Sequence, residues 1–187
     1  MVALEVCDVS MRRCGRSLVQ RVSLYADRGE MLALCGPEGS GTRTLLHLLG
    51  GRLVPDAGRV LVDGVLSSPD RSARAAGTTR HLAFGPDEAA ALLAEPDDGS
   101  ILLLDGPTVG LDSGGAHSLL AACRRRADAG AAVVLTVDTP HHVAVHATAL
   151  ALFVAGRLLS FGEPAIALVP ALQILSAGGY DLTSRAG

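Results

Sequence analysis

A glycine-rich stretch near the start of the chain constrains the fold more than any other feature. It reads Gly-Pro-Glu-Gly-Ser-Gly-Thr-Arg-Thr over residues 36–44, after an apolar run at residues 31–35 and before a leucine-rich run at residues 45–49. The order strand, glycine turn and helix is the context of a phosphate-binding loop. Glycines reach backbone angles that are closed to other residues, and the start of a helix favours an anion. We therefore predict an anion-binding loop formed by Gly36, Gly39, Ser40, Gly41, Thr42, Arg43 and Thr44.

The same stretch departs from a phosphate-binding loop after its last glycine. Such a loop carries lysine and then serine or threonine, whereas this chain has Thr42 and Arg43. The sequence contains no lysine, so no distant lysine can replace the missing one. Arg43 is rotated by about 100° from the expected lysine position, although its long side chain can bend toward a phosphate. A second interpretation stays open, in which the glycines form only a structural turn between a strand and a packed helix.

The composition favours one α/β domain and excludes several classes of function. The chain has 187 residues, 49% of them hydrophobic, and a formal net charge of −3. Its length suits one domain with a real core, and its negative charge argues against nucleic acid as a partner. No apolar run reaches the roughly 18–20 residues of a transmembrane segment, and we expect no leader sequence. The four cysteines lack zinc-type spacing, which favours reduced thiols and a cytoplasmic location.

Short apolar runs separated by turn residues predict the order of the strands and helices. Two antiparallel strands are expected at residues 2–9 and 18–25, and a further strand at residues 59–62. The expected central strands are residues 31–35, 81–84, 101–105 and 132–137. Residues 150–154 and 157–161 predict a closing hairpin. Helices are expected after the glycine loop, at residues 87–95, at residues 113–127 with Asp112 or Ser113 as N-cap, and at residues 164–177.

Two longer segments resemble the ATPase subunits of ATP-binding-cassette transporters. Residues 36–64 continue from the glycine loop to Pro-Asp-Ala-Gly-Arg-Val-Leu-Val-Asp-Gly, and residues 101–112 are similar to the Walker B strand and D-loop of that family. The resemblance covers residues 2 to 168. It implies an α/β fold with a three-layer P-loop NTPase core and an antiparallel β annex. We expect a single domain, divided into the annex (residues 1–30), the core (31–162) and a C-terminal helix and tail (163–187).

The resemblance also implies functional positions, and most of them carry other residues here. The Walker B carboxylate remains as Asp105, which we predict as the metal ligand. Cys14 stands at the position of the adenine-stacking aromatic residue, Thr42 at that of the lysine and Arg43 at that of the Mg²⁺-binding hydroxyl. Asp87 stands at the position of the glutamine, Gly106 at that of the general-base glutamate and Asp138 at that of the switch histidine. Residues 87–100 are too few for the helical subdomain with the Leu-Ser-Gly-Gly-Gln signature, so we expect that subdomain to be missing.

These replacements predict a degenerate cassette ATPase that binds ATP with Mg²⁺ weakly or not at all and does not hydrolyse it. A charged hydrogen bond contributes about 1.5–3 kcal/mol, and a general base contributes about 10²- to 10⁴-fold in rate. The resemblance implies a homodimer or a heterodimer with another ATPase subunit, or docking on a membrane complex. The expected location is then the cytoplasm, at the inner face of the membrane.

Two other classes of function stay open. One is an enzyme, either a residual ATPase or a metal-dependent enzyme that uses Asp105, Asp138 and two histidines. These histidines, His142 and His146, have the i, i+4 spacing of metal ligands on a helix that we expect to begin at residues 139–140. The other class is a dimerising scaffold whose loop holds no ligand. Melting with and without nucleotide distinguishes a binding protein from a scaffold, and phosphate release distinguishes binding from catalysis.

Overall fold

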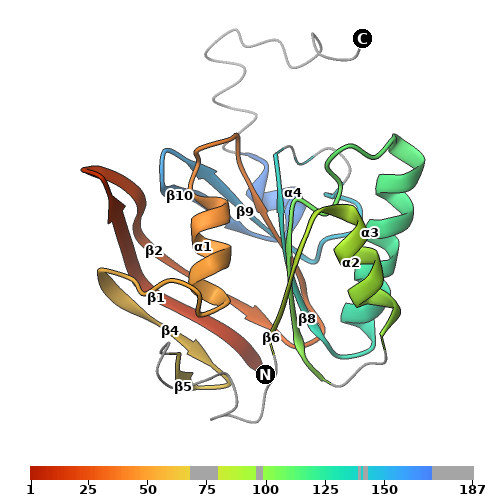
Figure 1. Ribbon diagram of the computed structural model, residues 1–187, viewed down its shortest axis with the longest axis horizontal. Helices are drawn as coiled ribbons and strands as arrows, with labels where there is room; N and C mark the ends of the chain where they lie inside the picture. Colours follow the sequence, from red (N-terminus) through yellow and green to blue (C-terminus); the bar gives the residue numbers. More distant parts are fainter. Residues whose placement is uncertain (68–79, 96–98, 139, 141–142, 170–187) are drawn as a thin grey trace, which may run out of the picture.

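The computed structural model describes residues 1–67, 80–95, 99–138, 140 and 143–169, and a six-stranded sheet lies at its centre (Figure 1). The strands follow the order β10-β9-β3-β8-β7-β6, and all are parallel except β10. Strands β3, β7 and β8 are buried at every residue, as expected for parallel strands that are covered on both faces. The strand bounds are β3 (Met31–Cys35), β6 (Arg80–Phe84), β7 (Ile101–Asp105), β8 (Ala132–Val137), β9 (Ala149–Val154) and β10 (Arg157–Gly162).

A four-stranded antiparallel sheet packs beside the central one. Its order is β2-β1-β4-β5, from strands β1 (Val2–Arg13), β2 (Arg16–Asp27), β4 (Ala57–Val62) and β5 (Val65–Leu66). The predicted annex of residues 1–30 therefore extends to β4 and β5. The reason is the register, which pairs Leu4 with Val62 and Val6 with Val60, so that the apolar side chains of β4 join the buried face of β1.

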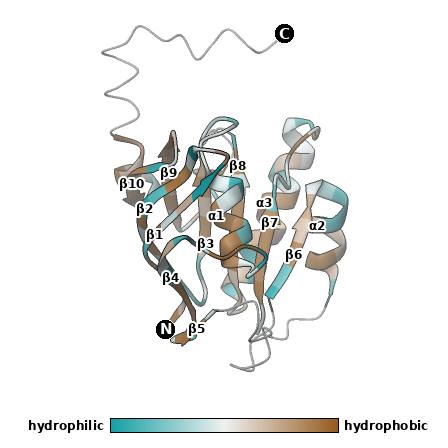
Figure 2. Cartoon of the chain, turned by 60° about the vertical axis from the view of Figure 1, so that its left-hand side comes forward, coloured by the Kyte–Doolittle hydropathy of each residue, from teal (hydrophilic) through white to brown (hydrophobic). Residues whose placement is uncertain are grey.

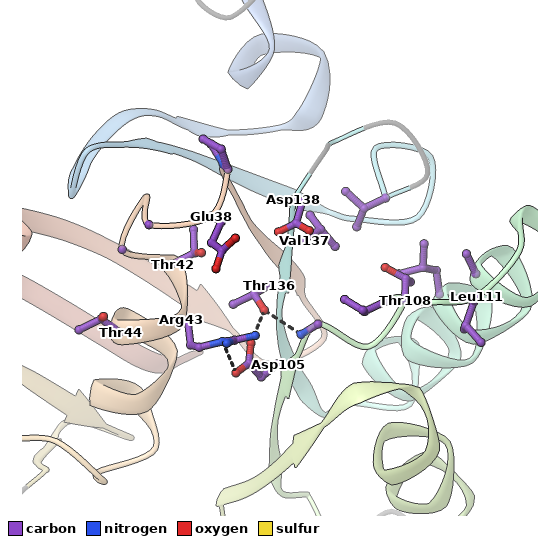
Figure 3. A pocket seen from close by; sticks show the side chains of 18 of the residues that line it. Glu38, Thr42, Arg43, Thr44, Asp105, Thr108, Leu111, Thr136, Val137 and Asp138 are labelled. Carbon is purple, nitrogen blue, oxygen red and sulfur yellow. Dashed lines mark hydrogen bonds and ion pairs between the residues drawn. The ribbon is translucent and has the colours of Figure 1, made fainter. Parts of the chain in front are cut away.

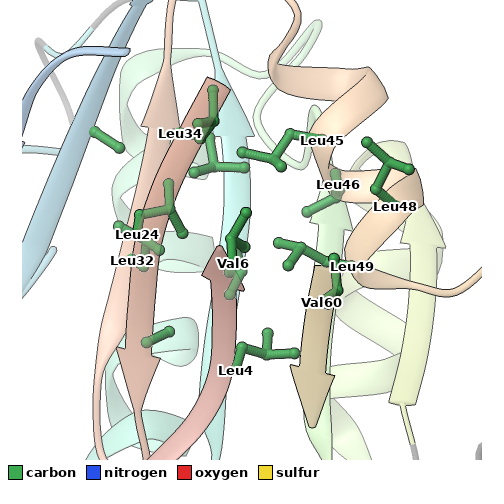
Figure 4. Packing of buried hydrophobic residues seen from close by; sticks show 14 of the residues in the cluster. Leu4, Val6, Leu24, Leu32, Leu34, Leu45, Leu46, Leu48, Leu49 and Val60 are labelled. Carbon is green, nitrogen blue, oxygen red and sulfur yellow. The ribbon is translucent and has the colours of Figure 1, made fainter. Parts of the chain in front are cut away.

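Helix α1 (Thr42–Leu49) fills the space between the two sheets. Its four leucines are fully or almost fully buried and pack against residues of both sheets, among them Leu4, Val6, Leu32 and Leu34 (Figure 4). Strands β3, β7 and β8 of the central sheet are coloured mainly as hydrophobic in Figure 2, in agreement with their burial. The predicted core helix after the glycine loop is confirmed.

Three further helices cover the other face of the central sheet: α2 (Gly85–Ala94), α3 (Ser113–Asp128) and α4 (Pro164–Ala167). The predicted N-cap of α3 is confirmed, because Asp112 Oδ1 accepts a hydrogen bond of 2.7 Å from the N–H of Gly115. Only the start of the predicted C-terminal helix is described, since residues 170–187 lie outside the described residues.

The connection between β6 and β7 is short. In the described residues it contains one helix, α2, of 10 residues, in agreement with the predicted absence of a helical subdomain. No helix in the described part of the chain is long and apolar enough to cross a membrane. The four cysteines are free, with Cys35 and Cys123 buried, Cys7 half-buried and Cys14 exposed.

Candidate functional site

A cavity of about 720 Å³ opens at the carboxyl edge of the central sheet, beside the glycine loop (Figure 3). Its walls are the loop after β3, residues 105–111 after β7, and residues 136–138 at the end of β8. These three strands are neighbours and parallel, so the segments that follow them converge at one edge. Of the seven predicted loop residues, five line the cavity: Gly39, Gly41, Thr42, Arg43 and Thr44. Gly36 and Ser40 do not line it.

The glycines of the loop have different structural roles. A β-carbon at Gly36 would lie 2.6 Å from the carbonyl oxygen of Phe153, and one at Gly41 would lie 2.2 Å from that of Leu18. Packing alone therefore requires these two glycines, as the structural-turn interpretation expects. Gly39 is different, because it has a φ of +80° and no atom within 4 Å of the added carbon. Its backbone faces open space at the cavity.

The loop leaves the start of α1 without a side-chain cap. Its N-cap is Gly41, which provides no hydrogen bond, and the first turn holds no acidic residue. Thr42 is buried, and its Oγ1 lies 3.4 Å from Ser40 Oγ, so it offers no charge to the cavity. Uncapped N–H groups at a helix start carry partial positive charge and favour an anion. The backbone of a phosphate-binding loop is thus present, without its lysine.

An ion pair between Arg43 and Asp105 forms the electrostatic centre of the site. Arg43 Nε lies 2.8 Å from Asp105 Oδ2; the arginine side chain is 73% exposed and the aspartate side chain 4% (Figure 3). The other carboxylate oxygen, Oδ1, accepts a hydrogen bond of 2.9 Å from Thr136 Oγ1. Thr136 also accepts one from the N–H of Gly106. Arg43 therefore bends toward the Walker B carboxylate, and Thr136 is a site residue that the sequence analysis missed.

His47 lies beneath this pair, one helical turn after Arg43 on α1. Its Nε2 is 4.0 Å from Asp105 Oδ2, and its ring packs against Phe84 with a centroid distance of 5.7 Å. Burial lowers the pKa of His47, and the attraction of Asp105 opposes this only in part. The positive charges of Arg52 and Arg43 lower this pKa further. The sequence held a signal for this neighbour, because positions 43 and 47 share one helix face.

The general-base position after β7 holds no side chain. Gly106 has a φ of +59°, and a β-carbon there would lie 3.0 Å from Val109 Cγ2. Asp138, at the switch position, lines the cavity and is exposed. Burial raises the pKa of the neighbouring Cys35 thiol to about 12, and the negative charge of Asp138 contributes to this rise. Asp87 lies in the first turn of α2 and does not line the cavity.

Of the two histidines predicted to bind a metal ion, only His146 is among the described residues. Residues 143–146 form a turn, and Val143 and Ala147 are buried. His146 Nε2 lies 3.0 Å from Nδ1 of His117 on α3, and His142 lies outside the described residues. Among the residues that are described, no group of three histidine, cysteine, aspartate or glutamate side chains could hold a metal ion.

Known proteins share both the sequence pattern and the fold. A family profile described as ABC transporter matches residues 19–86. Hemin import ATP-binding protein HmuV of Gloeobacter violaceus is 31% identical, over 89% of this chain and 84% of that protein. Cobalt import ATP-binding protein CbiO of Rhodobacter capsulatus is 28% identical, over 88% of this chain and 79% of its own length. The alignment with the first relative spans 231 residues, so that protein carries segments without a counterpart among these 187.

Solved structures agree on the fold. The ADP conformation of an ATP-binding cassette of an ABC transporter superposes with a TM-score of 0.78 at 15% identity, over 95% of this chain and 99% of the other. A second structure, cbiO1 of Clostridium perfringens, gives a TM-score of 0.74 at 17% identity, over 95% of each chain. Sequence identities this low show a common fold only. The chemistry of the site follows from the residues around the cavity.

Proposed function

This chain belongs to the ABC transporter ATP-binding family, and we propose that it is a degenerate member that does not hydrolyse ATP. The observation that carries the proposal is the absence of a general base beside Asp105. The next residue is Gly106, whose N–H is bonded to Thr136 and whose left-handed φ of +59° disfavours any side chain. Removal of a general base costs about 10²- to 10⁴-fold in rate. Asp105 itself is held by Arg43 and Thr136.

We predict that the purified protein releases phosphate from ATP and Mg²⁺ at the background rate. The matched control is Asp105→Asn, which keeps the shape of the side chain and removes its charge. Both proteins should give the same rate in a phosphate-release assay over a range of protein concentrations. Phosphate release that rises with protein concentration and is lost in Asp105→Asn would refute the proposal.

We further propose that the loop binds nucleotide weakly. The backbone N–H groups at the start of α1 attract the phosphates, but Thr42 supplies no charge and Cys14 no aromatic ring for the base. The predicted dissociation constant of ATP is between high micromolar and millimolar, about −4 to −5 kcal/mol of binding free energy. Isothermal titration calorimetry measures it directly. A low-micromolar constant would show that the missing contacts are replaced by others.

The family suggests the kind of partner. The names of the relatives describe ATP-binding proteins of hemin and cobalt import. We propose that this chain works in the cytoplasm as a non-catalytic subunit, at the inner face of a membrane. It would pair with a second copy, with a competent ATPase subunit or with a component of a membrane complex.

A scaffold without a ligand is the second candidate, and one observation favours it. Gly36 and Gly41 are required by packing against Phe153 and Leu18, so two of the three loop glycines are explained without any anion. Metal-dependent catalysis by Asp105, Asp138 and the histidines has no comparable support, since His146 pairs with His117. Nucleotide-dependent melting separates the weak binder from the scaffold.

A further inference from the structure

The Arg43–Asp105 pair joins two positions to which the resemblance assigns the divalent cation of this family. The resemblance assigns the metal to a hydroxyl at position 43, a glutamine at position 87 and the carboxylate of Asp105. Position 43 is arginine, and its Nε lies 2.8 Å from Asp105 Oδ2. Position 87 is an aspartate in α2 that does not line the cavity. These residues do not fit Mg²⁺, which requires oxygen ligands in an octahedral arrangement.

Both oxygens of the Asp105 carboxylate already have donors. Oδ2 accepts from Arg43, and Oδ1 accepts a 2.9 Å hydrogen bond from Thr136. The carboxylate is buried, so its negative charge needs a partner, and the guanidinium provides one. A divalent cation at Asp105 would have to displace this guanidinium, which would still belong to a side chain that lines the same cavity from the start of α1. The positive charges of the cation and of the guanidinium would repel each other in this cavity.

We propose that the Arg43 guanidinium is the resident cation of this site and excludes a divalent metal ion from Asp105. The inference rests on the proposed function only in that both concern the same cavity. A guanidinium has five N–H donors, and the 2.8 Å contact is made by the one on Nε. The remaining donors belong to a side chain that is 73% exposed and lines the cavity. A phosphate ligand of this loop is therefore taken up as the metal-free anion.

Titration with Mn²⁺, followed by electron paramagnetic resonance of the free ion, tests metal exclusion without nucleotide and without activity. The four proteins are the wild type, Arg43→Ser, Asp105→Asn and the double variant. We expect wild type and Asp105→Asn to bind Mn²⁺ equally weakly. Arg43→Ser should bind at least about tenfold more tightly, and the double variant should lose this gain. Circular dichroism and melting must show that each variant is folded, because Arg43→Ser leaves the buried Asp105 carboxylate without its charged partner.

Two outcomes would overturn the inference. One is a wild-type Mn²⁺ site that disappears in Asp105→Asn, which can be judged even without a folded Arg43 variant. The other is a folded Arg43→Ser protein that binds Mn²⁺ no more tightly than the wild type.

Melting with ATP supplies the second readout. ATP with a chelator should stabilise the wild type at least as much as ATP with Mg²⁺, whereas Arg43→Ser should show the reverse order. A larger shift with Mg²⁺ in the wild type would contradict the inference. If ATP shifts neither protein, the proposal of nucleotide binding fails, and the Mn²⁺ titration still decides on metal exclusion.

Discussion

Replacement of Gly41 by alanine should lower the free energy of unfolding by about 3 kcal/mol, the combined effect of two separate penalties. Gly41 has a φ of +100°, and a left-handed conformation costs an L-residue about 1–2 kcal/mol. The new β-carbon would also lie 2.2 Å from the carbonyl oxygen of Leu18 and 3.3 Å from the Cα of Gly156. These are backbone atoms that cannot rotate away, and such overpacking costs about 1–3 kcal/mol.

Urea unfolding measures this effect, and Gly39→Ala is the matched control. Gly39 also has a positive φ, +80°, but its added carbon meets no heavy atom within 4 Å. It should therefore lose only the conformational part, about 1 kcal/mol. Equal losses in the two variants would mean that the loop does not pack against β2 as described. A larger loss for Gly41→Ala would place the anchor of the loop at Leu18.

The central sheet is predictable from the sequence because its strands are short, continuous apolar runs. Residues 31–35, 101–105 and 132–137 have no alternation of polar and apolar side chains, which is typical of parallel strands covered on both faces. The structure confirms all three with the same bounds. The resemblance to a known family adds the three-layer architecture, and the order of the strands comes from the structure.

The extent of the antiparallel sheet is harder to predict. The sequence indicates a strand at residues 59–62, but it does not indicate which strand is its partner. In the structure it pairs with β1, more than 50 positions earlier, through contacts such as Leu4 with Val62. A pairing of this kind depends on where the chain returns after α1, and no local pattern encodes that return.

The ion pair at the centre of the site is the most informative difference between the prediction and the structure. From the sequence, we predict Arg43 at a phosphate and Asp105 at a metal ion, as separate groups. The structure joins them at 2.8 Å, because the start of α1 and the end of β7 face each other across the cavity. A signal for the pair existed in the resemblance itself. In that family the residues at positions 43 and 105 both bind the metal ion, so the two positions are close together. A cationic side chain at one position and a carboxylate at the other can therefore neutralise each other.

The double variant Thr42→Lys with Arg43→Ser should raise the affinity for ATP with Mg²⁺ by about 2–4 kcal/mol, roughly 30- to 1000-fold. The lysine restores one charged contact to the phosphates. The serine frees Asp105 from its guanidinium and supplies a hydroxyl for the metal. The backbone of the loop is already in place, and Thr42 lines the cavity, which gives a longer side chain room to extend. Calorimetry and melting at saturating nucleotide measure the gain.

The single variants separate the two contributions to this gain. Arg43→Ser alone should gain the metal dependence and little affinity, and Thr42→Lys alone should gain affinity that Mg²⁺ does not increase. Hydrolysis should stay absent in all three, because Gly106 supplies no base. A glutamate there would be strained by the left-handed backbone and by the contact with Val109.

Equal melting curves of double variant and wild type at saturating ATP and Mg²⁺ would mean that the loop is closed to phosphate in solution. The glycines would then serve packing alone, and the scaffold would be the correct description of this chain.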